Sequence, residues 1–121
     1  MRENGVTYVH RINRGGYKAG ALNNALKLTP SDVEIISVID ADYHVEPEYL
    51  RETVGYFIDS GLGFLQTPQD YRNVHQSFLT RQYYFADGFF YRAIMPSRNE
   101  ANAISFCGPM GLVRRDGPET V

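Results

Sequence analysis

Apolar positions over the first two-thirds of the chain alternate between strand-like and helix-like spacing. Val6 to His10 is β-branched and aromatic, and residues 34–39 and 62–66 are continuous apolar runs, which predicts three strands. Apolar residues at helical spacing predict helices over residues 18–28 and 47–58. Strands that alternate with helices predict an α/β fold with a mostly parallel sheet flanked by helices and joined by right-handed crossovers.

The last third of the chain has a different pattern. Aromatic residues over 76–92 predict one helix, which we expect Pro96 to end. Residues 104–106 and 110–113 are expected to form two short strands around a turn at Cys107-Gly108-Pro109. The final five residues, 117–121, show no pattern of a terminal helix or strand.

Composition narrows the classes of protein that fit. A length of 121 residues suits one domain, and 43% hydrophobic with 21% charged residues is typical of globular chains. A net charge of −2 gives no electrostatic reason to expect nucleic acid as a partner. The single cysteine, Cys107, excludes an intrachain disulfide and is typical of a reducing compartment, so we expect a cytoplasmic setting.

The strongest candidate for chemistry is Asp40-Ala41-Asp42, directly after the apolar run 35–39. Two carboxylates this close raise each other's proton affinity unless a cation lies between them. Mg²⁺ or Mn²⁺ takes such oxygen ligands and leaves coordination positions open for phosphate, and ligands bind at the carboxyl ends of strands in open α/β sheets. The alternative is that the two carboxylates cap the helix that begins near Pro47.

Four segments together resemble one family. Residues 18–26 begin with Lys-Ala-Gly, Asp40-Ala41-Asp42 forms an Asp-x-Asp motif, and residues 66–71 read Gln-Thr-Pro-Gln-Asp-Tyr. Phe106-Cys107-Gly108 follows, with Arg114-Arg115 beyond it. In this order and spacing, over nearly the whole chain, the segments are similar to processive family 2 glycosyltransferases of the cellulose-synthase-like group.

This resemblance implies a partial GT-A (nucleotide-diphospho-sugar transferase) fold, in which residues 1–121 are the central part of a single glycosyltransferase catalytic domain. The family's Thr-Glu-Asp segment, with the catalytic base, is expected beyond Val121. The resemblance also implies that the parent enzyme is embedded in the inner membrane, with this domain at the cytoplasmic face.

The resemblance assigns roles to individual residues. Asp42 is the expected direct metal ligand, with Asp40 supporting the metal or the ribose, and Mg²⁺ or Mn²⁺ is the expected cofactor. Lys18, Gly20 and Asn23 are expected at the nucleotide, with Lys18 at the diphosphate. The expected sugar and acceptor residues are Gln66, Thr67, Pro68, Gln69, Tyr71, Cys107 and Gly108.

Structural alternatives stay open for several of these residues. Lys18 also suits an exposed helix position, and Gly20 is either a close-approach position or an ordinary glycine of the first helical turn. Tyr71 is either a sugar platform or a core tyrosine. Arg114 and Arg115 are expected to be solvated, with a phosphate contact as the alternative.

The implied activity is metal-dependent, inverting transfer of a hexose from a nucleoside diphosphate sugar, most simply a UDP-sugar, to a growing β-linked polysaccharide. The expected partners are that donor and a glycan acceptor. One alternative is a non-catalytic truncated product that keeps residual sugar-nucleotide binding. Another is a protein-interaction module, in which the aromatic segment Phe78–Tyr91 docks a partner or a second copy of the chain.

Overall fold

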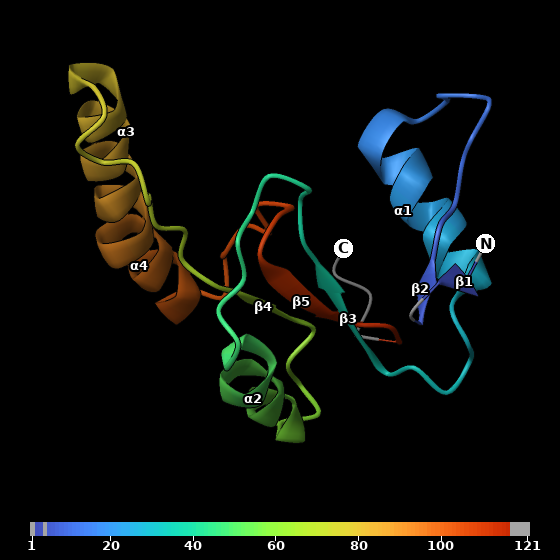
Figure 1. Ribbon diagram of the computed structural model, residues 1–121. Helices are drawn as coiled ribbons and strands as arrows, with labels where there is room; N and C mark the ends of the chain where they lie inside the picture. Colours follow the sequence, from blue (N-terminus) through green and yellow to red (C-terminus); the bar gives the residue numbers. More distant parts are fainter. Residues whose placement is uncertain (1, 4, 117–121) are drawn as a thin grey trace. The chain divides into compact units, whose positions relative to one another are not determined.

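The computed structural model describes residues 2–3 and 5–116, so the expectation for residues 117–121 lies outside the described residues. The chain forms two compact units, residues 1–33 and residues 34–121 (Figure 1). Every helix and strand belongs wholly to one of these units.

The first unit contains a short hairpin and one helix. Strands β1 (Arg2–Glu3) and β2 (Val6–Thr7) pair antiparallel, so the strand predicted over residues 6–10 is shorter than expected. Helix α1 (Tyr17–Leu28) confirms the helix predicted over residues 18–28. It ends at Thr29, whose backbone N–H donates to the carbonyl of Leu26.

A three-stranded antiparallel sheet organises the second unit (Figure 1). The central strand β5 (Gly111–Arg114) pairs antiparallel with β3 (Ile35–Val38) on one side and β4 (Phe64–Gln66) on the other. The prediction of a mostly parallel sheet is therefore wrong for the described residues.

The position of β5 explains this error. Because β3 and β4 both run antiparallel to β5, they point the same way as each other, as a strand–helix–strand crossover requires. They are not neighbours, however, since β5 lies between them and pairs with both. Leu112 of β5 is only 1% exposed, as expected for a central strand covered on its apolar face.

The strand predicted over residues 104–106 is also wrong, because this segment is irregular. Its Phe106 ring packs edge-on against Phe64 of β4, with 5.5 Å between ring centroids, and lies against the backbone of Gly111. Any side chain at Gly111 would collide with that ring. The segment therefore covers the end of the sheet instead of extending it.

Helices follow the strands of the second unit. Helix α2 (Tyr49–Thr53) continues into a 3₁₀ helix over Val54–Ile58, close to the predicted helix over residues 47–58. Helix α3 (Phe78–Phe89) runs through a π-helical turn (Phe90–Ile94) into α4 (Met95–Glu100). No helix of the described residues has the length and hydropathy that crossing a bilayer requires.

Pro96 does not end this helical stretch, contrary to prediction, because it lies in the first turn of α4. Proline is tolerated in a first turn, where its missing N–H is not needed. The π-helical turn just before it supplies the required break in the α-helical hydrogen-bond pattern, since the N–H of Met95 donates to the carbonyl of Phe90.

The core of the second unit lies between α2 and the sheet. Tyr49, Phe57, Met110 and Leu112 are buried there. Arg114 closes one side of this core: its guanidinium donates to the carbonyls of Phe57 (2.7 Å), Asp59 (2.9 Å) and Leu62 (3.1 Å). The expectation that Arg114 is solvated is therefore wrong.

Candidate functional site

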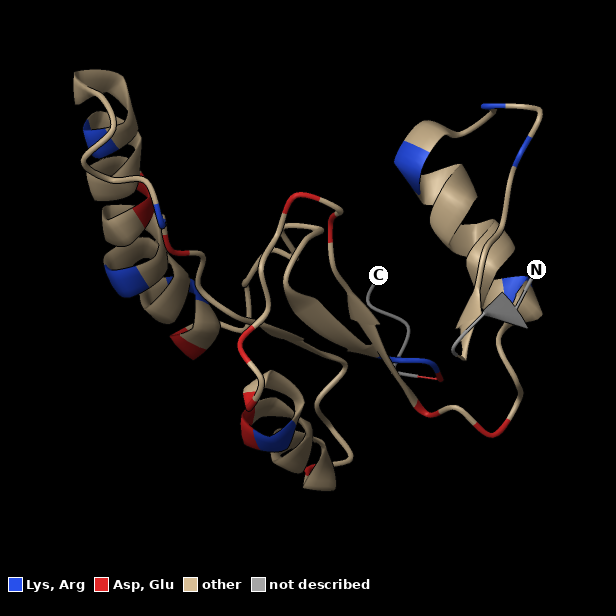
Figure 2. Cartoon of the chain, in the orientation of Figure 1, with Lys and Arg blue, Asp and Glu red and all other residues tan. Residues whose placement is uncertain are grey.

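The acidic pair lies on the loop that leaves β3, where Figure 2 shows red segments in the second unit. Asp40 is half-buried and Asp42 is exposed. The backbone N–H of Tyr43 donates to the carbonyl of Asp40 at 3.1 Å, which closes a turn around the pair. The turn holds both carboxylates beside a strand end and leaves Asp42 open to solvent.

The charges of both carboxylates act on the hydroxyl of Tyr43. Burial raises the pKa of the Tyr43 hydroxyl, and the negative charges of Asp42 and then Asp40 raise it further. Both effects favour the protonated hydroxyl, which is the form that donates a hydrogen bond.

The donor set of this turn fits Mg²⁺ or Mn²⁺ bound together with a substrate. Among the described residues, no group of three or more His, Cys, Asp or Glu side chains forms a complete protein cage for a metal. Mg²⁺ commonly takes one or two carboxylates, keeps several waters and accepts substrate phosphate oxygens for the rest. Asp42 and Asp40 match that open arrangement.

Two tyrosines tie the segment after β4 to its surroundings. The Tyr43 hydroxyl donates to Oε1 of Gln69 at 2.5 Å, and the Tyr71 hydroxyl donates to Oδ2 of Asp87 on α3 at 2.7 Å. This hydrogen bond to Asp87 is the main reason that the pKa of Tyr71 is raised to about 12. Tyr71 is half-buried, and this bond fixes its hydroxyl against α3.

Four of the expected sugar and acceptor residues come together around one loop. Gln66 accepts the backbone N–H of Cys107 (2.8 Å) through Oε1 and donates through Nε2 to the carbonyl of Pro109 (3.0 Å). The hydroxyl of Thr67 donates to the carbonyl of Met110 (2.5 Å). Gly108 has φ +92°, a conformation that favours glycine. Gln66 and Thr67 thus shape the loop that carries Cys107 and Gly108.

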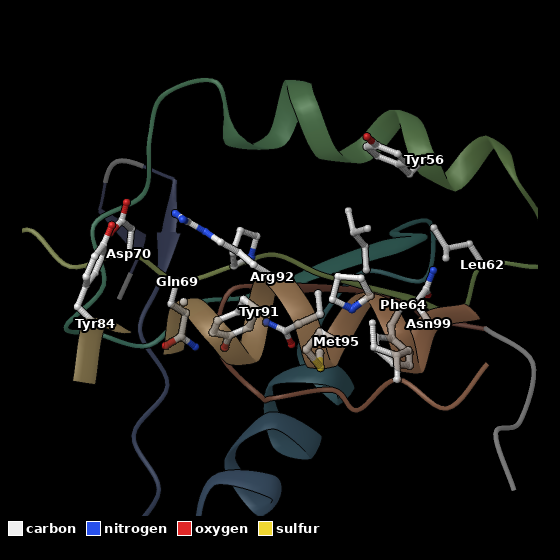
Figure 3. Close-up of a pocket in the computed structure, with 16 residues that line it drawn as sticks. Tyr56, Leu62, Phe64, Gln69, Asp70, Tyr84, Tyr91, Arg92, Met95 and Asn99 are labelled. Carbon is white, nitrogen blue, oxygen red and sulfur yellow. The ribbon is translucent and has the colours of Figure 1, made fainter. Parts of the chain in front are cut away.

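A cavity of about 580 Å³ opens between β4, its following segment and the long helical stretch (Figure 3). Figure 3 shows Tyr91, Arg92 and Met95 on the helical side of this cavity. Burial, and then the neighbouring Cys107, raise the pKa of Tyr91 above its usual range. Three expected sugar-site residues contribute to the lining: Gln66, Pro68 and Gln69.

Three of the expected nucleotide residues lie on α1, in the first unit. Lys18 lines a cavity of about 360 Å³ together with Arg11 and Arg14, which makes that concave surface basic. Asn23 is exposed. Gly20 is a close-approach position, because a Cβ there would collide with the backbone carbonyl oxygen of Gly15.

Arg11, which the sequence reasoning did not single out, shapes this loop. Its guanidinium donates to the carbonyls of Gly15 (2.6 Å), Asn13 (3.0 Å) and Tyr17 (3.2 Å). The bonds fold the loop back against the start of α1. Two arginines, Arg11 and Arg14, precede the Gly15-Gly16 pair, so the sequence offers donors for the free carbonyls of this loop but does not say which arginine binds them.

Three residues of the second site were also missed as site residues: Tyr43, Asp87 and Tyr91. Tyr43 follows Asp42 directly, so its position beside the motif was a usable signal. Asp87 is the only acid within the helical aromatic stretch 78–91, and a lone acid among aromatic residues commonly has a hydrogen-bond partner. For Tyr91 no local signal separates a site residue from a packing residue.

Comparisons with known proteins agree with the resemblance. The model of the family described as "Glycosyl transferase family 2" matches residues 2–117. A "Cellulose synthase catalytic subunit [UDP-forming]" of Pseudomonas fluorescens (strain SBW25) is 34% identical over 120 residues, covering 95% of this chain and 16% of the relative. A second cellulose synthase described as "UDP-forming", from Dictyostelium discoideum, is 35% identical over 103 residues, covering 81% of this chain and 10% of the relative.

A "Glucomannan 4-beta-mannosyltransferase 1" of Cyamopsis tetragonoloba is 36% identical over 78 residues, covering 63% of this chain and 15% of the relative. The chain thus spans 16% or less of the length of these three relatives. No solved structure matches the chain.

Proposed function

Because the chain belongs to glycosyl transferase family 2, we propose that it forms part of a catalytic domain that transfers a hexose from a nucleoside diphosphate sugar to a β-linked polysaccharide. The names of two relatives contain "UDP-forming", which supports UDP-sugars as donors. The observation that carries the proposal is the turn at Asp40–Asp42, which is tied through Tyr43 to the acceptor-side segment.

Asp42 and Asp40 are the residues that would hold a divalent cation in this site. When bound, the cation stabilises the negative charge that develops on the leaving diphosphate. Asp42 is exposed and so accessible to a phosphate-bearing ligand, while Asp40 is half-buried and fixed by the turn. In the first unit, Lys18, Arg11 and Arg14 line a basic cavity whose positive charge suits phosphate oxygens.

The acceptor is expected at the cavity lined by Gln69, Pro68 and Tyr91. Tyr91 offers an aromatic surface for a sugar ring, and Gln69 offers amide groups for sugar hydroxyls. Cys107 and Gly108 are held at this side by Gln66.

In the transfer, an acceptor hydroxyl oxygen attacks the anomeric carbon from the face opposite the diphosphate. The bond from that carbon to the diphosphate oxygen breaks, and a general base takes the hydroxyl proton.

The proposal is tested by calorimetric titration of UDP into the chain in the presence of Mn²⁺, with ADP as the comparison nucleotide. Wild-type protein is expected to bind UDP in preference to ADP. Asp42→Asn is expected to lower UDP affinity at least about tenfold, because loss of even an outer-shell partner of a metal ligand costs that much. Glu46→Gln is the matched control, because Glu46 is an exposed acid on the same loop. Absence of UDP binding, or equal UDP binding by Asp42→Asn, would overturn the proposal.

A second candidate function rests on the exposed apolar face of α3. Phe78, Phe85 and Phe89 are 76%, 61% and 64% exposed, and a contiguous apolar surface of this kind usually marks an interface. Docking of this face onto a second copy of the chain is therefore proposed as well. The membrane-embedded parent enzyme and its cytoplasmic setting stay predictions from the resemblance.

A further inference from the structure

The segment Gln69–Tyr71, called here the bridging segment, is held from two sides. On one side, the Tyr43 hydroxyl donates to Gln69 at 2.5 Å. On the other side, the Tyr71 hydroxyl donates to Asp87 at 2.7 Å, and the Tyr71 ring packs edge-on against Tyr84 with 6.3 Å between ring centroids. The bridging segment therefore connects the acidic turn to α3.

Both contacts on α3 come from one helix face. Tyr84 and Asp87 are three positions apart, a spacing that places side chains next to each other on a helix. Asp87 also acts on more than its direct partner, because its charge contributes to the raised pKa values of Tyr43, Tyr71 and Tyr91. The charge of one carboxylate on α3 thus acts on three tyrosine hydroxyls, of which that of Tyr71 is hydrogen-bonded to it.

The connection at Tyr43 is short and leaves little freedom. Tyr43 follows Asp42 in the chain, and its backbone N–H donates to the carbonyl of Asp40. A ligand that fixes the two carboxylates fixes this turn, and with it the Tyr43 side chain that holds Gln69. Order at the acidic turn is in this way coupled to order in the bridging segment.

We propose that Tyr43 and Asp87 are positioning residues that hold the bridging segment between the acidic turn and α3, so that donor binding at the turn orders the acceptor side of the site. The coupling part of this inference rests on the proposed function. The two-sided attachment itself rests on the hydrogen bonds alone. By thermodynamic reciprocity, a segment that donor binding orders also favours donor binding once it is ordered.

Hydrogen exchange followed by mass spectrometry tests the attachment without any ligand. Tyr71→Phe and Asp87→Ala are each expected to speed amide exchange in residues 66–71 about tenfold, the equivalent of one hydrogen bond worth about 1.4 kcal/mol. The double variant Tyr71→Phe with Asp87→Ala is expected to exchange no faster than either single variant. Asp87→Asn keeps an oxygen acceptor and is expected to exchange as slowly as the wild type. Tyr83→Phe, at an exposed position on the same helix, is the control.

Additive effects of the two single variants, or no effect of either, would overturn the attachment. The coupling is tested by repeating the exchange at saturating UDP and Mn²⁺. Wild-type protein is expected to show slower exchange in residues 66–71 on binding, and Tyr43→Phe is expected to bind UDP without that slowing. Equal slowing in Tyr43→Phe would overturn the coupling.

The two proposals fail in different ways. If wild-type protein binds no UDP, the proposed function is overturned and the coupling with it, whereas the ligand-free exchange still decides whether Tyr71 and Asp87 hold the segment. If UDP binds and residues 66–71 exchange at an unchanged rate, the proposed function stands and the coupling is overturned.

Discussion

Replacing Arg114 by alanine is expected to destabilise the second unit strongly. Arg114 lies on the central strand β5, and its guanidinium reaches the end of the 3₁₀ helix that follows α2. It makes three hydrogen bonds there, to the carbonyls of Phe57, Asp59 and Leu62, and its guanidinium carbon lies 5.4 Å from the centre of the Phe57 ring. One side chain thus ties the sheet to the helical layer.

The size of the loss follows from these contacts. A hydrogen bond from a charged donor contributes roughly 1.5–3 kcal/mol when buried, and the half-buried position of Arg114 reduces this to about 1 kcal/mol each. The stacking on Phe57 adds about 0.5 kcal/mol. The total of about 3–4 kcal/mol is a large part of the stability expected for a small domain, about 5–15 kcal/mol.

Urea unfolding followed by far-ultraviolet circular dichroism measures this loss. Arg114→Ala is expected to lower the unfolding midpoint by about 2 M urea. Arg114→Lys keeps the charge but not the planar guanidinium group, so its unfolding midpoint is expected to lie between those of the wild type and Arg114→Ala. Arg51→Ala is the control, since Arg51 forms an exposed ion pair with Glu48 and should shift stability by about 0.5 kcal/mol or less. A midpoint for Arg114→Ala equal to that of Arg51→Ala would refute the reasoning.

Further predictions concern other parts of the chain. Gly20→Ala is expected to cost about 1–3 kcal/mol in urea unfolding, because the new methyl collides with backbone, whereas Gly88→Ala meets open space on a helix and should stabilise by about 0.5–1 kcal/mol; equal effects would contradict this. Since the pKa of Tyr71 is raised from 10.0 to about 12, the folded state holds that proton more tightly than the unfolded chain. Stability should therefore fall as the pH rises through this range, and Tyr71→Phe should reduce the fall in urea titrations at several pH values. Phe85→Ser is expected to weaken self-association in sedimentation velocity, and a wild-type monomer at every concentration would contradict that proposal.

Local patterns predicted most of the elements. The Ala- and Leu-rich stretch of α1 and the apolar run of β3 have spacings that only one type of element fits well, and both elements form close to their expected positions. The sequence does not decide whether Gly20 is a close-approach position or an ordinary first-turn glycine, because close approach depends on how the preceding loop folds back.

The sheet order was beyond a local pattern. The residues Gly111 to Arg114 fit a strand at the edge of the sheet as well as one at its centre. Nothing in these residues indicates that the strand lies between β3 and β4. Arg114 was misassigned for the same reason: its partners are carbonyls 52 to 57 positions away in the chain. Long-range hydrogen bonds from a side chain to backbone carbonyls leave no periodic signal in the sequence.

For the site, the sequence predicts the acidic pair and the acceptor-side residues, and the structure adds the hydrogen bonds that connect them. Gln66 reaches Cys107, and Gln69 reaches Tyr43 beside Asp42. The residues that make these connections are hydrogen-bond partners whose identity follows from the tertiary fold. Asp87 is the clearest case, because its partner Tyr71 lies sixteen positions earlier, on a different element.

The most direct test of the central claim is the mutual dependence of Mn²⁺ and UDP binding, measured by calorimetry in both orders and corrected for Mn²⁺–UDP binding without protein. If Asp42 holds a cation that contacts the diphosphate, each ligand should raise the affinity for the other by the same factor. Asp42→Asn should abolish this factor, and Asp40→Asn should reduce it less, because Asp42 is the more exposed carboxylate. UDP affinity that is the same with and without Mn²⁺, or an unchanged factor in Asp42→Asn, would contradict the account.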